Sequence, residues 1–210
     1  AIAFDNSTDS SNAGTSLTFS HTTSGSDRVL FVVIQHTSNI STCSYGGVAM
    51  TLEAQANFTN RSRIYSLVNP ATGSNSVVIS GSNQSIQACA LSYTGANQTA
   101  ASLIEDTVSQ QTSGSSDTQT VTTTVDGCWQ IGTVGIQRAA TLSSGGTVRE
   151  TGNIWNSNVA DSGSPFNLGS KSMSFSFVSV NQDSIGLAFS PSAGGGGGVA
   201  YRPLQAFAGL

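Results

Sequence analysis

Two histidines, His21 and His36, are the only side chains in this sequence whose ordinary pKa suits proton transfer near neutral pH. Hydrolytic chemistry requires such a base beside a nucleophile, or a metal held by ligands at a fixed spacing. Neither histidine lies in a recognisable Ser-His-Asp or His-x-His arrangement. Serine is frequent along the whole chain, so a serine near a histidine carries little information. We interpret both as ordinary surface or strand-end histidines and expect no catalytic residue and no enzyme.

Oxygen-bearing side chains near the start of the chain are candidate calcium ligands. Asp5, Asn6 and Asp9 supply the oxygen atoms that Ca²⁺ prefers, and this hard cation suits the loops of β-sandwiches. Their spacing is not that of an EF-hand, however, and Asp and Asn residues also make turns. We therefore expect no metal and no cofactor.

A second group of carboxylates lies further along the chain. Glu105 and Asp106 are adjacent and could form a carboxylate pair with Asp126 or Asp161. Nothing in the sequence brings these residues together, so we interpret them as structural.

The chain has three cysteines, Cys43, Cys89 and Cys128, an odd number without metal-ligand spacing. Cys89 lies in an apolar segment that we expect to be a strand, and Cys128 precedes a tryptophan. We interpret them as buried free thiols. One disulfide with a spare thiol is the alternative.

The two tryptophans differ in their surroundings. Trp129 begins an apolar run and is expected in the core, whereas Trp155 is flanked by polar residues that include Asn153 and Asn156. A tryptophan of the second kind can stack on a sugar ring while asparagines hydrogen-bond to its hydroxyls, or it can anchor a contact between subunits. Trp155, Asn153 and Asn156 are therefore a candidate glycan contact, with interface or core packing of the tryptophan as alternatives.

The composition limits the classes of protein to which the chain can belong. Only 9% of its 210 residues are charged, against about 25% in typical domains. The net charge is -4 and there is no basic run, so nucleic-acid binding is not expected. No apolar stretch approaches the roughly 18–20 residues of a membrane span. The sequence shows no charged start followed by an apolar core, so we expect no signal peptide.

The longest unbroken apolar run is Val29–Ile34, and it predicts a β-strand because it is short and rich in β-branched residues. Alternate residues of a strand point to opposite faces, and here both faces are apolar. Both should be covered, the outer face by another strand layer, a terminal arm or a neighbouring subunit. The candidate interface residues of this strand are Leu30, Val32 and Ile34.

Helical periodicity is nearly absent, and short runs of Val, Ile, Phe, Thr and Tyr alternate with turn residues. This pattern predicts an all-β fold, an antiparallel β-sandwich of jelly-roll-like type. Residues 109–120 are expected to be a polar loop or edge region. Strands are expected at residues 2–5, 15–20, 28–36, 47–54, 62–68, 75–80, 85–93, 102–108, 117–125, 128–137, 146–151, 171–179 and 184–190.

The C-terminal part of the chain departs from this rhythm. Five glycines, residues 194–198, connect the expected sandwich domain, residues 1–193, to a short apolar arm. A glycine run is a flexible connector that is costly to order. We expect the arm, within residues 194–210, to contact another copy, with an added strand on its own sheet as the alternative. The candidate interface residues of the arm are Val199, Tyr201, Leu204, Phe207 and Leu210.

Several turn motifs occur in the middle of the chain: Tyr45-Gly46-Gly47, Met50-Thr51, Leu67-Val68-Asn69-Pro70-Ala71-Thr72-Gly73, and Ser92-Tyr93-Thr94-Gly95 with Gln98-Thr99. Through them, residues 28–108 resemble a jelly-roll-type β-sandwich module of bacteriophage virion proteins and bacterial surface proteins. The resemblance implies a structural or adhesive role. The motif residues are turn and core positions, so it implies no active site.

Composition, pattern and resemblance lead to one expected function and one alternative. We expect a non-enzymatic structural protein of a bacteriophage particle, located in the virion as a capsid, decoration or tail component. Its expected partners are copies of itself, in a homo-oligomer, and other virion proteins. The alternative is an extracellular or cell-surface module that binds carbohydrate or adheres to a cell-surface glycan.

Overall fold

The computed structural model describes residues 1–37, 39–57, 61–135, 140–150 and 158–193, and in these ranges strands dominate. The only helix among them is a single turn, α1 (Ala100–Leu103). The strands of the first sheet are β1 (Ala3–Thr23), β2 (Val29–His36), β3 (Ile40–Tyr45), β4 (Val48–Ala49), β5 (Thr51–Ala56), β6 (Arg61–Val68) and β7 (Gly73–Thr94). Those of the second are β8 (Ile104–Thr123), β9 (Trp129–Gly135), β10 (Ala140–Ser144), β11 (Thr147–Glu150), β12 (Asn158–Asp161) and β13 (Gly169–Phe189).

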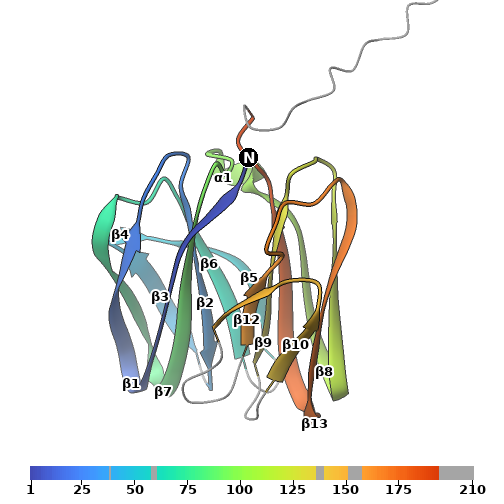
Figure 1. Cartoon of the computed structure of the whole chain (residues 1–210). Coiled ribbons are helices and arrows are strands. Elements are labelled where there is room, and N and C mark those ends of the chain that lie inside the picture. Colours follow the sequence, from blue (N-terminus) through green and yellow to red (C-terminus); the bar gives the residue numbers. More distant parts are fainter. Residues whose placement is uncertain (38, 58–60, 136–139, 151–157, 194–210) are drawn as a thin grey trace, which may run out of the picture.

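Both sheets are antiparallel and they pack against each other, which confirms the predicted all-β sandwich (Figure 1). The arm and its five candidate contact residues lie outside the described residues, as do Trp155, Asn153 and Asn156.

The two sheets have the same strand order except that β4, at the edge of the first, has no counterpart in the second. The first runs β4-β3-β7-β2-β6-β5 with β1 on β7, and the second runs β10-β13-β9-β12-β11 with β8 on β13. The registers agree as well, because Val29 pairs with Tyr93 in the first sheet and Trp129 pairs with Phe189 in the second. The chain therefore contains an internal repeat. We call residues 3–94 the first repeat and residues 104–189 the second.

Each sheet is rolled over on itself, because its longest strands bend. In β1 the pairing with β7 shifts between Gly14 and Ser16. Beyond this bend the strand returns over its own beginning, so that the His21 ring contacts Thr8 at 3.0 Å and Ser92 at 3.1 Å. In the second repeat, β8 turns back in the same way. This rolled antiparallel ribbon is the jelly-roll-like arrangement that was predicted.

Both faces of β2 are buried, as the sequence predicts, and each faces a different core. Leu30, Val32 and Ile34 pack inside the first repeat, whereas Val29, Phe31 and Val33 pack between the repeats. The cover of the outer face is thus another strand layer of the same chain. This corrects the expectation that Leu30, Val32 and Ile34 contact a neighbouring copy, because the roll of the first sheet encloses them completely.

Aromatic rings hold the two repeats together. Phe31 lies 4.8 Å from Phe189, and Tyr93 lies 5.4 Å from Trp129, measured between ring centroids. Trp129 is thus a core residue, as predicted. Burial of such rings contributes a large share of the stability of a β-sandwich.

Residues 109–120 belong to β8, so their prediction as a loop is wrong. The alternative, an edge region, is confirmed, because among the described strands β8 pairs only with β13. Their polar side chains hide the strand from a search for apolar runs. Toward the end of β8 these side chains pair with hydroxyls of β13, at 2.9 Å between Thr118 and Ser174 and 2.8 Å between Thr120 and Ser172. A ladder of this kind stabilises a sheet without apolar residues on its outer face.

Candidate functional site

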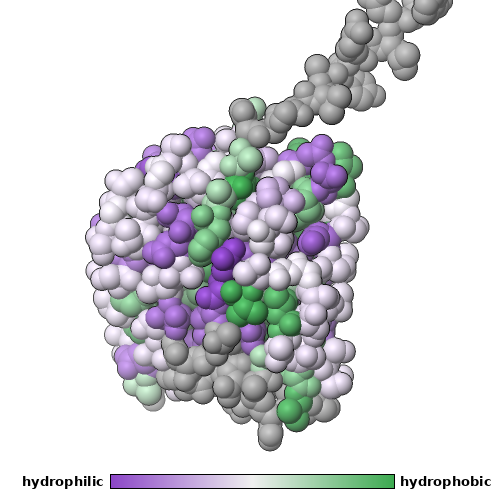
Figure 2. All heavy atoms as spheres, viewed as in Figure 1, coloured by the Kyte–Doolittle hydropathy of each residue, from purple (hydrophilic) through white to green (hydrophobic). Residues whose placement is uncertain are grey.

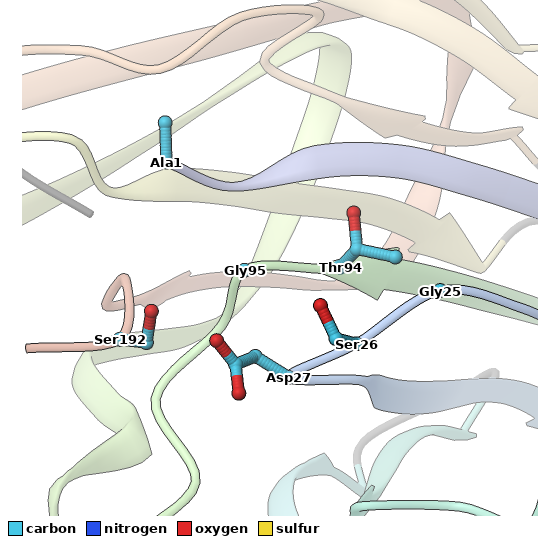
Figure 3. Close-up of a pocket in the computed structure, with 7 residues that line it drawn as sticks. All are labelled: Ala1, Gly25, Ser26, Asp27, Thr94, Gly95 and Ser192. Atoms are coloured by element: carbon cyan, nitrogen blue, oxygen red, sulfur yellow. The ribbon is translucent and has the colours of Figure 1, made fainter. Parts of the chain in front are cut away.

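Two hollows are lined by Ala1 and by Ser102 of α1, respectively. Figure 1 shows the N-terminus and α1 at the same end of the molecule. The first, the repeat-1 pocket, has a volume of about 580 Å³. Figure 3 shows it between the β1–β2 turn and the residues that follow β7. The second, the repeat-2 pocket, has a volume of about 660 Å³ and lies at the corresponding turn between β8 and β9. Its lining includes Glu105, Thr124, Val125, Asp126, Leu168 and Pro191.

The turns beside the two pockets are held by equivalent contacts. In the first repeat, the Asp5 carboxylate accepts hydrogen bonds from the backbone N–H and the hydroxyl of Ser24. In the second repeat, Glu105 accepts the same pair of bonds from Thr124, at 3.2 and 2.8 Å. Asp5 and Glu105 are one hundred residues apart in the sequence, as are Ser24 and Thr124, so the contacts occupy equivalent positions in the two repeats. Each acidic residue therefore fixes the turn that borders its pocket.

The segments that end the two repeats meet between the pockets. Ser192 donates its backbone N–H to the carbonyl of Gly95 at 2.9 Å, and Asn97 donates to the carbonyl of Ser190 at 3.0 Å. Ser192 consequently lines both pockets. The last described residue, Ala193, lines the repeat-2 pocket.

The repeat-1 pocket is lined by small and polar residues. Its lining includes Gly25, Ser26, Asp27 and Gly95, and Figure 3 shows no large apolar side chain among the labelled residues. A Cβ atom on Gly25 would lie 2.6 Å from a methyl carbon of Thr94, so this turn excludes a larger residue.

The repeat-2 pocket combines apolar side chains with negative charge. Val125 and Leu168 are 40% and 60% exposed and line the pocket together, and exposed apolar residues that form a patch can mark a contact surface. The Asp126 carboxylate accepts a hydrogen bond from the backbone N–H of Leu168 at 2.8 Å and so positions that residue. Neither lysine nor arginine is among the described residues that line the pocket. The arrangement suits an apolar ligand that carries a positive charge.

Cys128 lies under the β8–β9 turn, and the negative charge of the pocket affects the pKa of its thiol. Burial, followed by the charge of Glu105, raises the pKa of its thiol to about 12. Burial likewise raises the pKa of Cys43 to about 12 and that of Cys89 well above its usual value. All three cysteines are buried and unpaired, as the first of the two sequence interpretations states. None of these thiols is an activated nucleophile.

His21 is buried within β1, which corrects its interpretation as a surface or strand-end residue. His36 is the last residue of β2, as the strand-end interpretation states, and is buried too. The Ser92 hydroxyl donates to Asp5 at 2.7 Å, so the His21 Nε2–H donates to Ser92 and Nδ1 accepts from Thr8. Burial lowers the pKa of His21 to about 4, although the nearby charge of Asp5 raises it. The ring is therefore neutral at pH 7 and serves as a polar link within the roll.

Two of the candidate calcium ligands, Asp5 and Asn6, hydrogen-bond to other parts of β1 and its surroundings. Asp5 is engaged by Ser24 and Ser92, and the Asn6 amide donates to the carbonyl of Thr22 at 3.1 Å. Partial burial raises the pKa of Asp5, but the hydrogen bonds from Ser24 and Ser92 outweigh it and lower the pKa overall. In the described part of the chain, no three residues among His, Cys, Asp and Glu are grouped so that they could hold a metal ion.

The four later carboxylates do not form one group, and Asp106 accepts a hydrogen bond from the backbone N–H of Thr122 at 2.7 Å. Glu105 and Asp126 line the repeat-2 pocket together, which the sequence left undecided. Asp161 lies instead in the core between the repeats, where it accepts bonds from Arg149 at 2.7 Å and from the Tyr93 hydroxyl at 2.9 Å. Sequence reasoning missed Arg149, whose guanidinium also stacks over the ring of Phe4. Its position in a polar segment offered no cue.

No family model matches the chain, and no curated protein matches it. No helix within the described ranges is long and apolar enough to cross a membrane.

Proposed function

We propose that this chain is a non-enzymatic structural protein of a bacteriophage particle, located in the virion as a capsid, decoration or tail component. Its partners are copies of itself and other virion proteins. The observation that carries the proposal is the position of the repeat-2 pocket. Exposed apolar side chains gather there, and Ala193, the last described residue, is part of the lining.

The remaining surface of the sandwich suits a passive building block. Six large hydrophobic residues are exposed among the described residues, and most are scattered: Val48, Leu52, Val125, Val148, Leu168 and Val178. On the face shown in Figure 2, hydrophobic residues form small patches between polar ones. Outside the repeat-2 pocket the described surface thus offers little that would hold a partner by apolar contact.

Three polar groups that could perform chemistry, those of His21, Asp5 and Glu105, are engaged in holding the fold. The neutral His21 links Thr8 to Ser92, and the carboxylates of Asp5 and Glu105 secure turns. A general base must instead be able to accept a proton from a bound substrate. The arrangement supports a structural role.

Light scattering of the purified full chain at increasing concentrations, with parallel passage over immobilised glycans, tests this proposal. An assembly protein forms oligomers and passes the glycan columns. A strictly monomeric protein that a glycan retains would overturn the proposal in favour of the carbohydrate-binding or adhesive module.

A further inference from the structure

Three positions that line the repeat-2 pocket carry larger apolar residues than their counterparts in the first repeat. Aligning the turns by the Asp5–Ser24 and Glu105–Thr124 contacts places Val125 where the first repeat has Gly25. The register of the long strands makes Leu168 equivalent to Thr72 and Pro191 equivalent to Gly95. At each position a small or polar residue is replaced by a larger apolar one. The fold does not require this change, because the first repeat closes without it.

The two exposed apolar side chains lie beside two carboxylates. Glu105 uses Oε2 to hold Thr124, and Asp126 uses Oδ1 to hold the backbone of Leu168. The pocket volume of about 660 Å³ falls in the range of roughly 300–1,000 Å³ that is usual for ligand sites. A fitting occupant has apolar side chains with one cation among them.

The chain itself contains a segment of this kind. Beyond Ala193 come five glycines and then twelve residues whose only charged side chain is Arg202. Tyr201 precedes this arginine and Leu204 follows it closely, so apolar groups flank the positive charge. Charge and polarity therefore match those of the repeat-2 pocket.

We propose that the repeat-2 pocket receives residues 199–210 of a second copy, with Tyr201 and Leu204 against Val125 and Leu168 and with Arg202 beside Glu105 and Asp126. The inference rests on the proposed function, because it supplies the contact through which copies assemble. A second copy is favoured by the glycines. Ala193 already lines the pocket of its own chain, where a short turn would suffice, whereas five glycines reach up to about 17 Å toward a neighbour.

Disulfide trapping between full-length chains tests the proposal. One preparation carries Leu168→Cys and another carries Tyr201→Cys, and the two are mixed and oxidised. The native thiols do not compete, since all three are buried with raised pKa values. The expected product is a covalent dimer that contains one chain of each kind. Adding Arg202→Glu to the second chain should lower its yield.

Val178→Cys mixed with Tyr201→Cys is the matched control, because Val178 is as exposed as Leu168, at 60%, and lies at the bend of β13. It should give little cross-linked dimer. Equal yields from both mixtures would overturn the proposal, and so would no dimer from either.

A double variant, Leu168→Cys with Tyr201→Cys in one chain, identifies the source of the segment. If oxidation closes the disulfide within single chains while the mixture gives no dimer, the pocket holds its own segment and the proposal fails. Sedimentation of the same samples separates this result from failure of the proposed function. Oligomers without the Leu168–Tyr201 cross-link refute only the pocket contact, whereas a monomer at all concentrations refutes assembly as well.

Discussion

Tyr93 and Phe189 occupy equivalent positions in the two repeats, and their rings meet in the core between them with centroids 5.0 Å apart. The pair differs by one hydroxyl. That of Tyr93 donates to Asp161, a completely buried carboxylate of the other repeat. A largely apolar interface between the repeats thus includes a hydrogen bond to a charge.

Removing this hydroxyl should destabilise the protein measurably. Tyr93→Phe keeps the ring but deprives Asp161 of a donor, and hydrogen bonds to charged groups contribute about 1.5–3 kcal/mol. We expect the free energy of unfolding, measured in urea, to fall by about this amount. Tyr45→Phe is the control, because the Tyr45 hydroxyl donates to neutral carbonyls of His21 and Gly73 and should cost about 1 kcal/mol. A larger loss from Tyr45→Phe would contradict the assignment.

The buried His21 should make stability depend on pH. Its pKa is about 4 in the folded chain, against 6.5 ordinarily, so the unfolded chain binds a proton that the folded chain does not. This contribution is fully present above pH 6.5 and is lost as the pH falls toward 4. At 1.36 kcal/mol per pKa unit the loss is about 3 kcal/mol. His21→Val introduces the residue found at the equivalent position of the second repeat, Val121. This variant should flatten the dependence of stability on pH between pH 4 and 6.5. An equally steep curve for the variant would assign the effect to other groups.

The interior of the second repeat contains glutamines where the first has apolar residues. Both amide atoms of Gln182 are buried without a hydrogen-bond partner, and the equivalent residue in the first repeat is Ile86. Burial of an unpaired amide costs roughly 1–3 kcal/mol, so Gln182→Ile should raise the urea midpoint. Gln119→Leu should lower it, because the Gln119 amide donates to Asp117 and to the carbonyl of Thr133. The prediction fails if both changes shift the midpoint in the same direction.

The three thiols should be inert in the folded protein. Burial raises the pKa values of Cys43 and Cys128 to about 12, and the thiolate is the form that reacts. A thiol reagent such as dithionitrobenzoate at pH 8 should label the native chain only as fast as it unfolds and should label all three cysteines in denaturant. Rapid labelling of a native cysteine would show that its cover opens.

The sequence predicts the fold class because apolar alternation is a local property. Val29–Ile34 shows two apolar faces, and each face lies in a core. The repeat was not visible, because equivalent interior positions carry different chemistry: Leu30 in the first repeat corresponds to Gln130 in the second. The two repeats share their strand order and pairing register, but their residue types differ. The repeat can therefore be recognised from the register of the strands and not from the sequence pattern.

The site was less predictable than the fold. Glu105 and Asp126 come together only because the β8–β9 turn returns to the start of β8, a consequence of the bend in a long strand. Nothing local to either residue encodes that return. The burial of His21 is not predictable from the sequence for the same reason, since Ser92, which the ring contacts, is distant in sequence.

Sedimentation velocity of the full chain and of a chain ending at Ala193 tests most directly the claim that copies join through the C-terminal segment. Because the account places the segment on a neighbouring copy, the shorter chain should fold with an unchanged urea midpoint. The account predicts oligomers for the full chain and a monomer for the shorter one. If both chains assemble alike and the shorter one only loses thermal stability, the segment is a strand of its own sheet and the claim is wrong.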